Sequence, residues 1–126
     1  MKKIFFLFVF VLLSFVANAK ITKYQIYSVS IKESGKEWTT WKKANIPVTI
    51  DSVKKRIYIE TQYKQIIDIE GFEEKYTDIS IQLTSYATDT YYNNIYVNIN
   101  IVSEEEIYLS IVYNDLIIMY KMRIIE

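Results

Sequence analysis

The 126-residue sequence predicts a single all-β domain, an antiparallel meander of about eight or nine strands that forms a small closed or nearly closed barrel. Apolar and polar residues alternate over several stretches, the pattern of strands with one buried face. Beyond the N-terminal segment, no stretch has the apolar spacing of a helix. The joints between strands are short and rich in turn-forming residues, without linkers or repeats. These features together are typical of a closed antiparallel sheet.

The alternation predicts both the strands and the side chains that face the barrel interior. Ile95, Val97 and Ile99, for example, alternate with Tyr96 and Asn98. We expect strands near residues 21–33, 36–43, 46–51, 55–61, 64–70, 76–87, 92–102, 106–113 and 116–125. We expect the inward positions to be Ile57, Ile59, Ile79, Ile81, Leu83, Ile95, Val97, Ile99, Ile107, Leu109, Ile111 and Ile118. Because these side chains are bulky and a barrel of about eight strands has just enough room for them, the sequence predicts a packed interior.

The N-terminus predicts export from the cell. A basic start, Lys2-Lys3, precedes an apolar run from Ile4 to Val16 and the small-x-small sequence Ala17-Asn18-Ala19. The apolar run is shorter than the roughly 20 residues that span a bilayer. We therefore predict a signal peptide over residues 1–19 and a mature domain over residues 20–126, with no membrane span and a periplasmic or extracellular location. The alternative is an uncleaved membrane anchor.

The composition excludes several functions. The chain has 15 basic and 15 acidic residues, and removal of Lys2 and Lys3 leaves a slight negative excess, so nucleic acid is not an expected partner. The chain has no histidine and no cysteine, which removes the usual general base, the common nucleophile arrangements and the usual zinc ligands. Disulfides are also excluded. We predict a protein that is not an enzyme and that needs no metal or cofactor.

The acidic residues give weak signs of chemistry. Asp68 and Glu70 lie two apart on one strand, where a carboxylate pair could serve glycoside hydrolysis. The segments beginning at Glu73 and Ser103 offer oxygen ligands of the kind that calcium takes. Neither segment has the spacing of a calcium loop, and most charged residues simply face water. We interpret all of them as solvated turns and strand ends.

The register of the C-terminal hairpin can be predicted if Asn114-Asp115 is a two-residue loop. One face then holds the pairs Tyr113–Leu116, Ile111–Ile118, Leu109–Tyr120 and Ile107–Met122, and the other holds Ser110–Met119, Tyr108–Lys121 and Glu106–Arg123. The first face is apolar, and the second brings opposite charges together. A slip of one residue would mix the two faces, so the register is strongly specified.

The two tryptophans, Trp38 and Trp41, are predicted to lie on opposite faces of one strand. With Ser34-Gly35 as a two-residue loop, Trp38 joins the aliphatic face. Trp41 falls on the other face with Tyr24 and Ile26. Because aromatic anchors dominate binding sites, we expect these three residues to form an exposed patch for a partner or ligand. The alternatives are a bulge that turns both indoles inward and a terminal segment that covers Trp41.

Without catalytic groups, the predicted function is binding. We expect an exported module whose aromatic-polar surface binds a protein or a glycan. Further candidate residues lie opposite the aliphatic face: Tyr58, Tyr96, Asn98 and Tyr108. Tyrosine is also an ordinary strand former, so its presence there is not specific. Pairing at an open sheet edge would build a homodimer.

Two other kinds of barrel fit the same alternation. A barrel of lipocalin-like or calycin-like architecture would carry a small amphipathic ligand in its interior. An outer-membrane barrel would turn the aliphatic face to lipid, but the chain is short for eight membrane crossings with their loops. The bulky inward positions favour a packed barrel that functions through its surface.

The first half of the mature chain resembles short, functionally uncharacterised, secreted β-rich proteins of flavobacteria and related bacteria. The similar elements are Trp-x-x-Trp-Lys at residues 38–42, Ile46-Pro47, Asp51 and Arg56-Ile57. This resemblance implies a bacterial envelope or extracellular location. It implies no activity, cofactor or functional residue.

Overall fold

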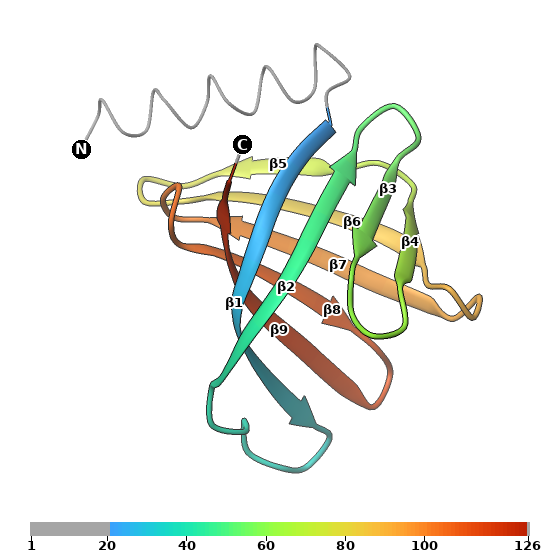
Figure 1. Cartoon of the computed structure of the whole chain (residues 1–126), viewed down its shortest axis with the longest axis vertical. Helices are drawn as coiled ribbons and strands as arrows, with labels where there is room; N and C mark the ends of the chain where they lie inside the picture. Colours follow the sequence, from blue (N-terminus) through green and yellow to red (C-terminus); the bar gives the residue numbers. More distant parts are fainter. Residues whose placement is uncertain (1–20, 126) are drawn as a thin grey trace.

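The computed structural model describes residues 21–125, which form antiparallel strands joined by turns and loops (Figure 1). The predicted signal peptide lies outside the described residues. The strands are β1 (Ile21–Glu33), β2 (Lys42–Asp51), β3 (Arg56–Ile59), β4 (Gln65–Ile69), β5 (Glu73–Tyr76), β6 (Ile81–Thr88), β7 (Asn94–Ile101), β8 (Ile107–Val112) and β9 (Leu116–Ile124). None of the described residues forms a helix long and apolar enough to cross a membrane.

Eight of the strands close into a barrel, which confirms the predicted fold class. The sheet order is β4-β3-β2-β1-β9-β8-β7-β6-β5, and an additional pairing of β4 with β6 closes the ring. Asp68 and Ile69 of β4 lie opposite Thr88 and Ala87 of β6. β5 therefore stays outside the ring, at the margin of the sheet (Figure 1).

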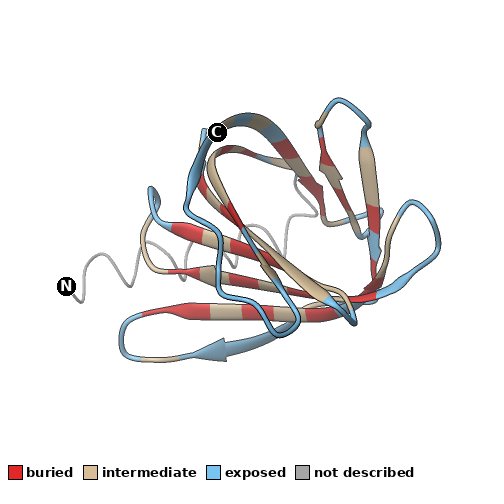
Figure 2. Ribbon diagram, turned by 90° about the horizontal axis from the view of Figure 1, so that it is seen from below, coloured by how far each residue is buried: buried red, intermediate tan, exposed pale blue. Residues whose placement is uncertain are grey.

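β5 continues the course of β4 along the same edge of β6. The chain kinks at Gly71, whose φ of 151° favours glycine, and Glu73 then pairs with Thr84. All four residues of β5 are exposed (Figure 2). The sequence did not predict this strand, because a run of Glu, Glu, Lys and Tyr has no apolar alternation.

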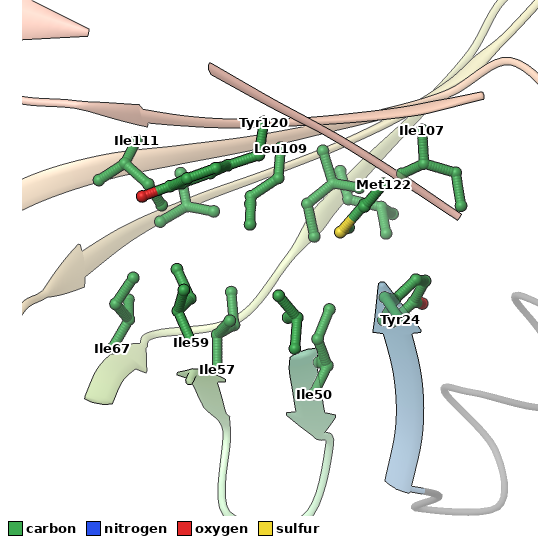
Figure 3. Close-up of a cluster of buried hydrophobic side chains, with 14 of the residues drawn as sticks. Tyr24, Ile50, Ile57, Ile59, Ile67, Ile107, Leu109, Ile111, Tyr120 and Met122 are labelled. Atoms are coloured by element: carbon green, nitrogen blue, oxygen red, sulfur yellow. The ribbon is translucent and has the colours of Figure 1, made fainter. Parts of the chain in front are cut away.

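The barrel interior is lined with aliphatic side chains that face each other from opposite walls (Figure 3). The largest fully buried ones are Ile26, Ile50, Ile57, Ile59, Ile67, Ile81, Ile107, Leu109, Ile111 and Met122. Burying each such side chain contributes about 1.5 to 3 kcal/mol. The predicted inward positions are confirmed except for Ile79, which is 78% exposed in the turn between β5 and β6. An inward aliphatic face is the reverse of an outer-membrane barrel, whose apolar band faces lipid.

The β8–β9 hairpin has the predicted register. Leu109 lies opposite Tyr120, and Tyr108 lies opposite Lys121. The loop closes through the Tyr113 backbone N–H, which donates to the Leu116 carbonyl over 2.8 Å. The alternation of apolar and polar residues was sufficient here because neither strand contains an irregularity.

A bulge in β1 overturns the prediction for Tyr24 and Ile26. The register of β1 shifts between Ile26 and Ser28 against both neighbours. Against β9, Tyr27 is an extra residue of β1, whereas against β2 the extra residue lies in β2, between Lys43 and Ile46. A bulge reverses which face the following residues occupy. Tyr24 and Ile26 therefore lie in the core instead of beside Trp41 on the outside (Figure 3 shows Tyr24). Burial raises the pKa of the Tyr24 hydroxyl.

The predicted strand over residues 36–43 is also wrong. Residues 34–41 form a loop, and β2 begins only at Lys42, opposite Val29. Gly35, with a φ of 77°, sits in the turn where the Lys36 backbone N–H donates to the Glu33 carbonyl. Trp38 is in this loop and is 40% exposed, so it does not join the aliphatic core as predicted.

Candidate functional site

The loops at one end of the barrel carry most of the exposed aromatic side chains. In an antiparallel meander every second connection lies at the same end. At this end lie the connections 34–41, 60–64, 89–93 and 113–115 (Figure 1). They present Trp38, Trp41, Tyr63, Tyr91 and Tyr92, which are 40%, 38%, 76%, 76% and 87% exposed. We call this set of five residues the aromatic end.

Hydrogen bonds hold loops of the aromatic end to other parts of the barrel. The Ser34 backbone N–H donates to the Asp115 carbonyl over 2.9 Å, which joins the first loop to the last. The Ile66 backbone N–H donates to Thr90 Oγ1 over 2.8 Å, which fixes the 89–93 loop to the start of β4. The first contact links two loops directly, and the second fixes a third loop to a strand, so the loops that carry Trp38, Tyr91 and Tyr92 are anchored to other parts of the barrel.

Asp89 organises the loop that holds Tyr91 and Tyr92. Its Oδ1 accepts hydrogen bonds from the backbone N–H groups of Tyr91 at 3.0 Å and Asn93 at 2.8 Å. Its Oδ2 accepts one from Asn93 Nδ2 at 3.0 Å. Partial burial alone would raise the pKa of Asp89, but the hydrogen bonds from Asn93, Tyr91 and Tyr113 together lower it. Tyr92 has a φ of 65°, a left-handed conformation that places it at the tip of the turn.

Trp41 connects the aromatic end with the side of the barrel. The Thr39 backbone N–H donates to the Ile31 carbonyl over 2.9 Å, and Ser30 Oγ donates to the Thr39 carbonyl over 2.7 Å. These bonds hold the loop against the outer surface of β1. The indole of Trp41 then lies near β9, with Lys121 Nζ 4.3 Å from the ring centroid.

Three of the predicted site residues share the outer surface of β7 and β8, which we call the outer wall: Tyr96, Asn98 and Tyr108. The side chains of all three are half-buried. Tyr96 packs edge-to-face on the exposed Tyr86, with ring centroids 5.2 Å apart. The Tyr108 hydroxyl donates to Glu106 Oε1 over 2.7 Å, which raises its pKa to about 12. Asn98 Oδ1 is shielded from solvent and has no hydrogen-bond partner among the described residues.

Tyr58 lies away from the outer wall, on β3. Lys64 Nζ lies 5.0 Å from its ring centroid. The structure therefore brings together Trp41, Tyr96, Asn98 and Tyr108 along β7 to β9, separates Tyr58 from them, and buries Tyr24 and Ile26.

Asp68 and Glu70 have different surroundings. Asp68 Oδ1 accepts a hydrogen bond from Arg56 Nε over 2.6 Å, while Glu70 lies beyond the end of β4. Across residues 21–125, no group of three or more acidic side chains is placed to hold a metal ion.

Comparison of the chain with protein-family models, curated proteins and solved structures returns no significant match. The site is therefore defined by the chemistry of its own residues. Sequence reasoning identified Trp41 but missed Tyr63, Tyr91 and Tyr92. A usable signal was present, because these tyrosines lie in or beside turn-rich joints that a meander brings to one end.

Proposed function

We propose that this protein is an exported, non-enzymatic binding protein that engages a protein or glycan partner through the aromatic end. The observation that supports this proposal is that the loops at one end of the barrel carry five exposed aromatic residues, Trp38, Trp41, Tyr63, Tyr91 and Tyr92. Single exposed apolar residues are ordinary, but clustered exposed aromatics are characteristic of interaction sites.

The support beneath the aromatic end adds to this proposal. Braced aromatic side chains lose little conformational freedom on binding, because tyrosine and tryptophan have few rotatable bonds. The outer wall is a less favourable surface, since Tyr96, Asn98 and Tyr108 are partly covered by their neighbours. The outer wall would serve as a secondary contact surface beside the aromatic end, next to Trp41.

The alternative function is carriage of a small amphipathic ligand inside the barrel, as in a lipocalin-like protein. It has less support, because bulky aliphatic side chains such as Ile57, Leu109 and Ile111 occupy the interior. A ligand would have to displace these side chains and lose their packing.

The proposal can be tested by retention of material from an extract of the producing cells. The mature chain is immobilised as wild type and as the variant Tyr63→Ser, Tyr91→Ser, Tyr92→Ser. Because all three positions are highly exposed, these changes should alter the stability little, within about 0.5 kcal/mol each. We expect the wild type to retain a protein or glycan that the variant does not retain.

A matched control separates the aromatic end from general loss of surface hydrophobicity. The control variant carries Ile21→Ser, Val53→Ser and Ile79→Ser, which remove exposed apolar residues away from the aromatic end. It should retain the same material as the wild type. Equal retention by both variants, or equal loss in both, would contradict the proposal.

A further inference from the structure

We infer that the free edge of β5 is a second binding site, which takes an extended peptide of a partner protein by strand addition. The site lies away from the aromatic end, so this inference does not rest on the proposed function. It is supported by two separate features: the hydrogen-bonding groups of the β5 backbone and an apolar groove beside them.

The backbone of β5 presents unpaired groups on its outer side. The Thr77 backbone N–H donates to the Ser80 carbonyl over 2.9 Å, so Thr77 points toward β6. Because the direction alternates along a strand, Lys75 and Glu73 also point toward β6, opposite Gln82 and Thr84. The N–H and C=O groups of Glu74 and Tyr76 therefore point away from it. Among residues 21–125, no strand pairs with that edge.

The groove lies beside this edge, between β5 and the β2–β3 turn. Its volume is about 260 Å³, and it is lined by Ser52, Lys55, Ile69, Gly71, Phe72, Glu74 and Leu83. Pockets for drug-sized molecules are usually larger, about 300 to 1,000 Å³. The groove is therefore suited to one or two side chains of a strand laid along β5, with Phe72, Ile69 and Leu83 as the apolar contacts. Strand-addition sites combine these two features, main-chain bonds for affinity and a side-chain pocket for specificity.

The charges of β5 argue against a second copy of the same strand as the occupant. When two copies of one strand pair antiparallel about a two-fold axis, the residue at the axis lies opposite its own copy. An axis between two residues would set a residue whose backbone groups point toward the partner opposite one whose groups point away. An axis at Glu73 or Lys75 places like charges opposite each other. An axis at Glu74 pairs Glu73 with Lys75 on one face, but it sets the two Glu74 carboxylates against each other on the face of the groove. An axis at Tyr76 places Glu74 opposite Asp78 of the other copy. Since like charges directly opposite are destabilising, the edge favours a different chain.

The probe for this site is a random 12-residue peptide library displayed on phage and selected on the mature wild-type chain. The selected peptides are then synthesised and titrated against wild type, Glu74→Pro and Glu74→Ala. Glu74→Pro removes an outward N–H without touching the bonds to β6, and proline is tolerated at strand edges. Glu74→Ala keeps that N–H and removes only the carboxylate, so it is the matched control. Thermal unfolding of each variant checks that the fold is retained.

We expect the selected peptides to share an apolar residue within an extended pattern. Glu74→Pro should bind them about tenfold or more weakly than Glu74→Ala, the effect of losing one main-chain hydrogen bond, because both variants lack the carboxylate and only the proline variant lacks the N–H. If Glu74→Pro does not fold, N-methylation along the peptide replaces it and should abolish binding at every second position only. Peptides that bind both variants equally, uniform effects of N-methylation, failure to select any peptide, or a dimer through β5 in sedimentation would each overturn the inference.

Discussion

The ammonium group of Lys121 lies 4.3 Å from the centre of the Trp41 ring, so a residue of the 34–41 loop is held against β9 on the outside of the barrel. This contact joins the aromatic end to the outer wall. Trp38 lies three residues earlier in the same loop. Within residues 21–125, no lysine lies over its ring in the same way. The two tryptophans are equally exposed but differently supported.

The Trp41–Lys121 contact should be measurable as a coupling energy. A double-mutant cycle of Trp41→Leu and Lys121→Met is expected to give a coupling of about 0.5 to 1 kcal/mol, the range for exposed cation–π pairs. Urea unfolding of the four proteins provides the measurement. The same cycle with Trp38→Leu should give a coupling below about 0.3 kcal/mol, as for independent sites. Equal coupling energies in the two cycles would show that Lys121 does not interact preferentially with Trp41.

Two isoleucines test the assignment of the interior. Ile57 is fully buried and Ile79 is 78% exposed, although the alternation predicts both to face inward. Ile57→Ala should lower the free energy of unfolding by about 2 to 5 kcal/mol, because it leaves a cavity. Ile79→Ala should change it by less than about 0.5 kcal/mol. A comparable loss in both variants, measured by denaturant unfolding, would refute the placement of the β5–β6 turn.

The bulge at Tyr27 determines the orientation of the first part of β1. Deletion of Tyr27 would turn either Tyr24 and Ile26 or the residues after the bulge to the wrong face. Loss of two buried side chains predicts destabilisation of roughly 3 to 6 kcal/mol. Tyr27→Phe keeps the bulge and loses only the hydroxyl bond to the Glu105 carbonyl, an effect of about 1 kcal/mol. The bulge would lose its assigned role if the deletion were no worse than Tyr27→Phe in thermal unfolding.

The lowered pKa of Asp89 predicts that this residue contributes to stability in a pH-dependent way. Its pKa in the folded protein is lowered from 3.8, so its ionised form is stabilised by folding. The stability advantage of wild type over Asp89→Asn should therefore be complete well above pH 3.8 and should shrink as the pH falls through the lowered pKa. Unfolding curves recorded across the acidic range measure this difference. A difference that does not vary with pH would mean that the Asp89 charge has no role in holding the loop.

The sequence predicted the parts of the fold that depend on uninterrupted alternation. The β8–β9 register was correct from Ile107–Met122 to Ile111–Ile118, because apolar and polar residues alternate from Ile107 to Ile111. The predicted pairing of Glu106 with Arg123 is not part of it, since β8 begins at Ile107. The same reasoning failed in β1, where Tyr27, an extra residue relative to β9, reversed the faces. A bulge of this kind leaves no mark in the alternation when the flanking residues include Ser28 and Ser30, which fit either face.

The candidate site was only partly predictable. Trp41 was identified because its face in the predicted strand differed from that of Trp38. Tyr63 is far from Tyr91 and Tyr92 in the chain, and their loops become neighbours only when the barrel closes through β4 and β6. Local pattern describes a strand and its faces, whereas the grouping of loops depends on the topology of the whole sheet.

The central claim is that the partner contacts the aromatic end. The most direct measurement is photo-crosslinking from p-benzoylphenylalanine placed at Tyr92, with Ile79 as the control position at the exposed β5–β6 turn. Irradiation in an extract of the producing cells is predicted to give a discrete adduct from position 92 and none from position 79. An adduct from position 79 alone, or identical adducts from both positions, would contradict the claim.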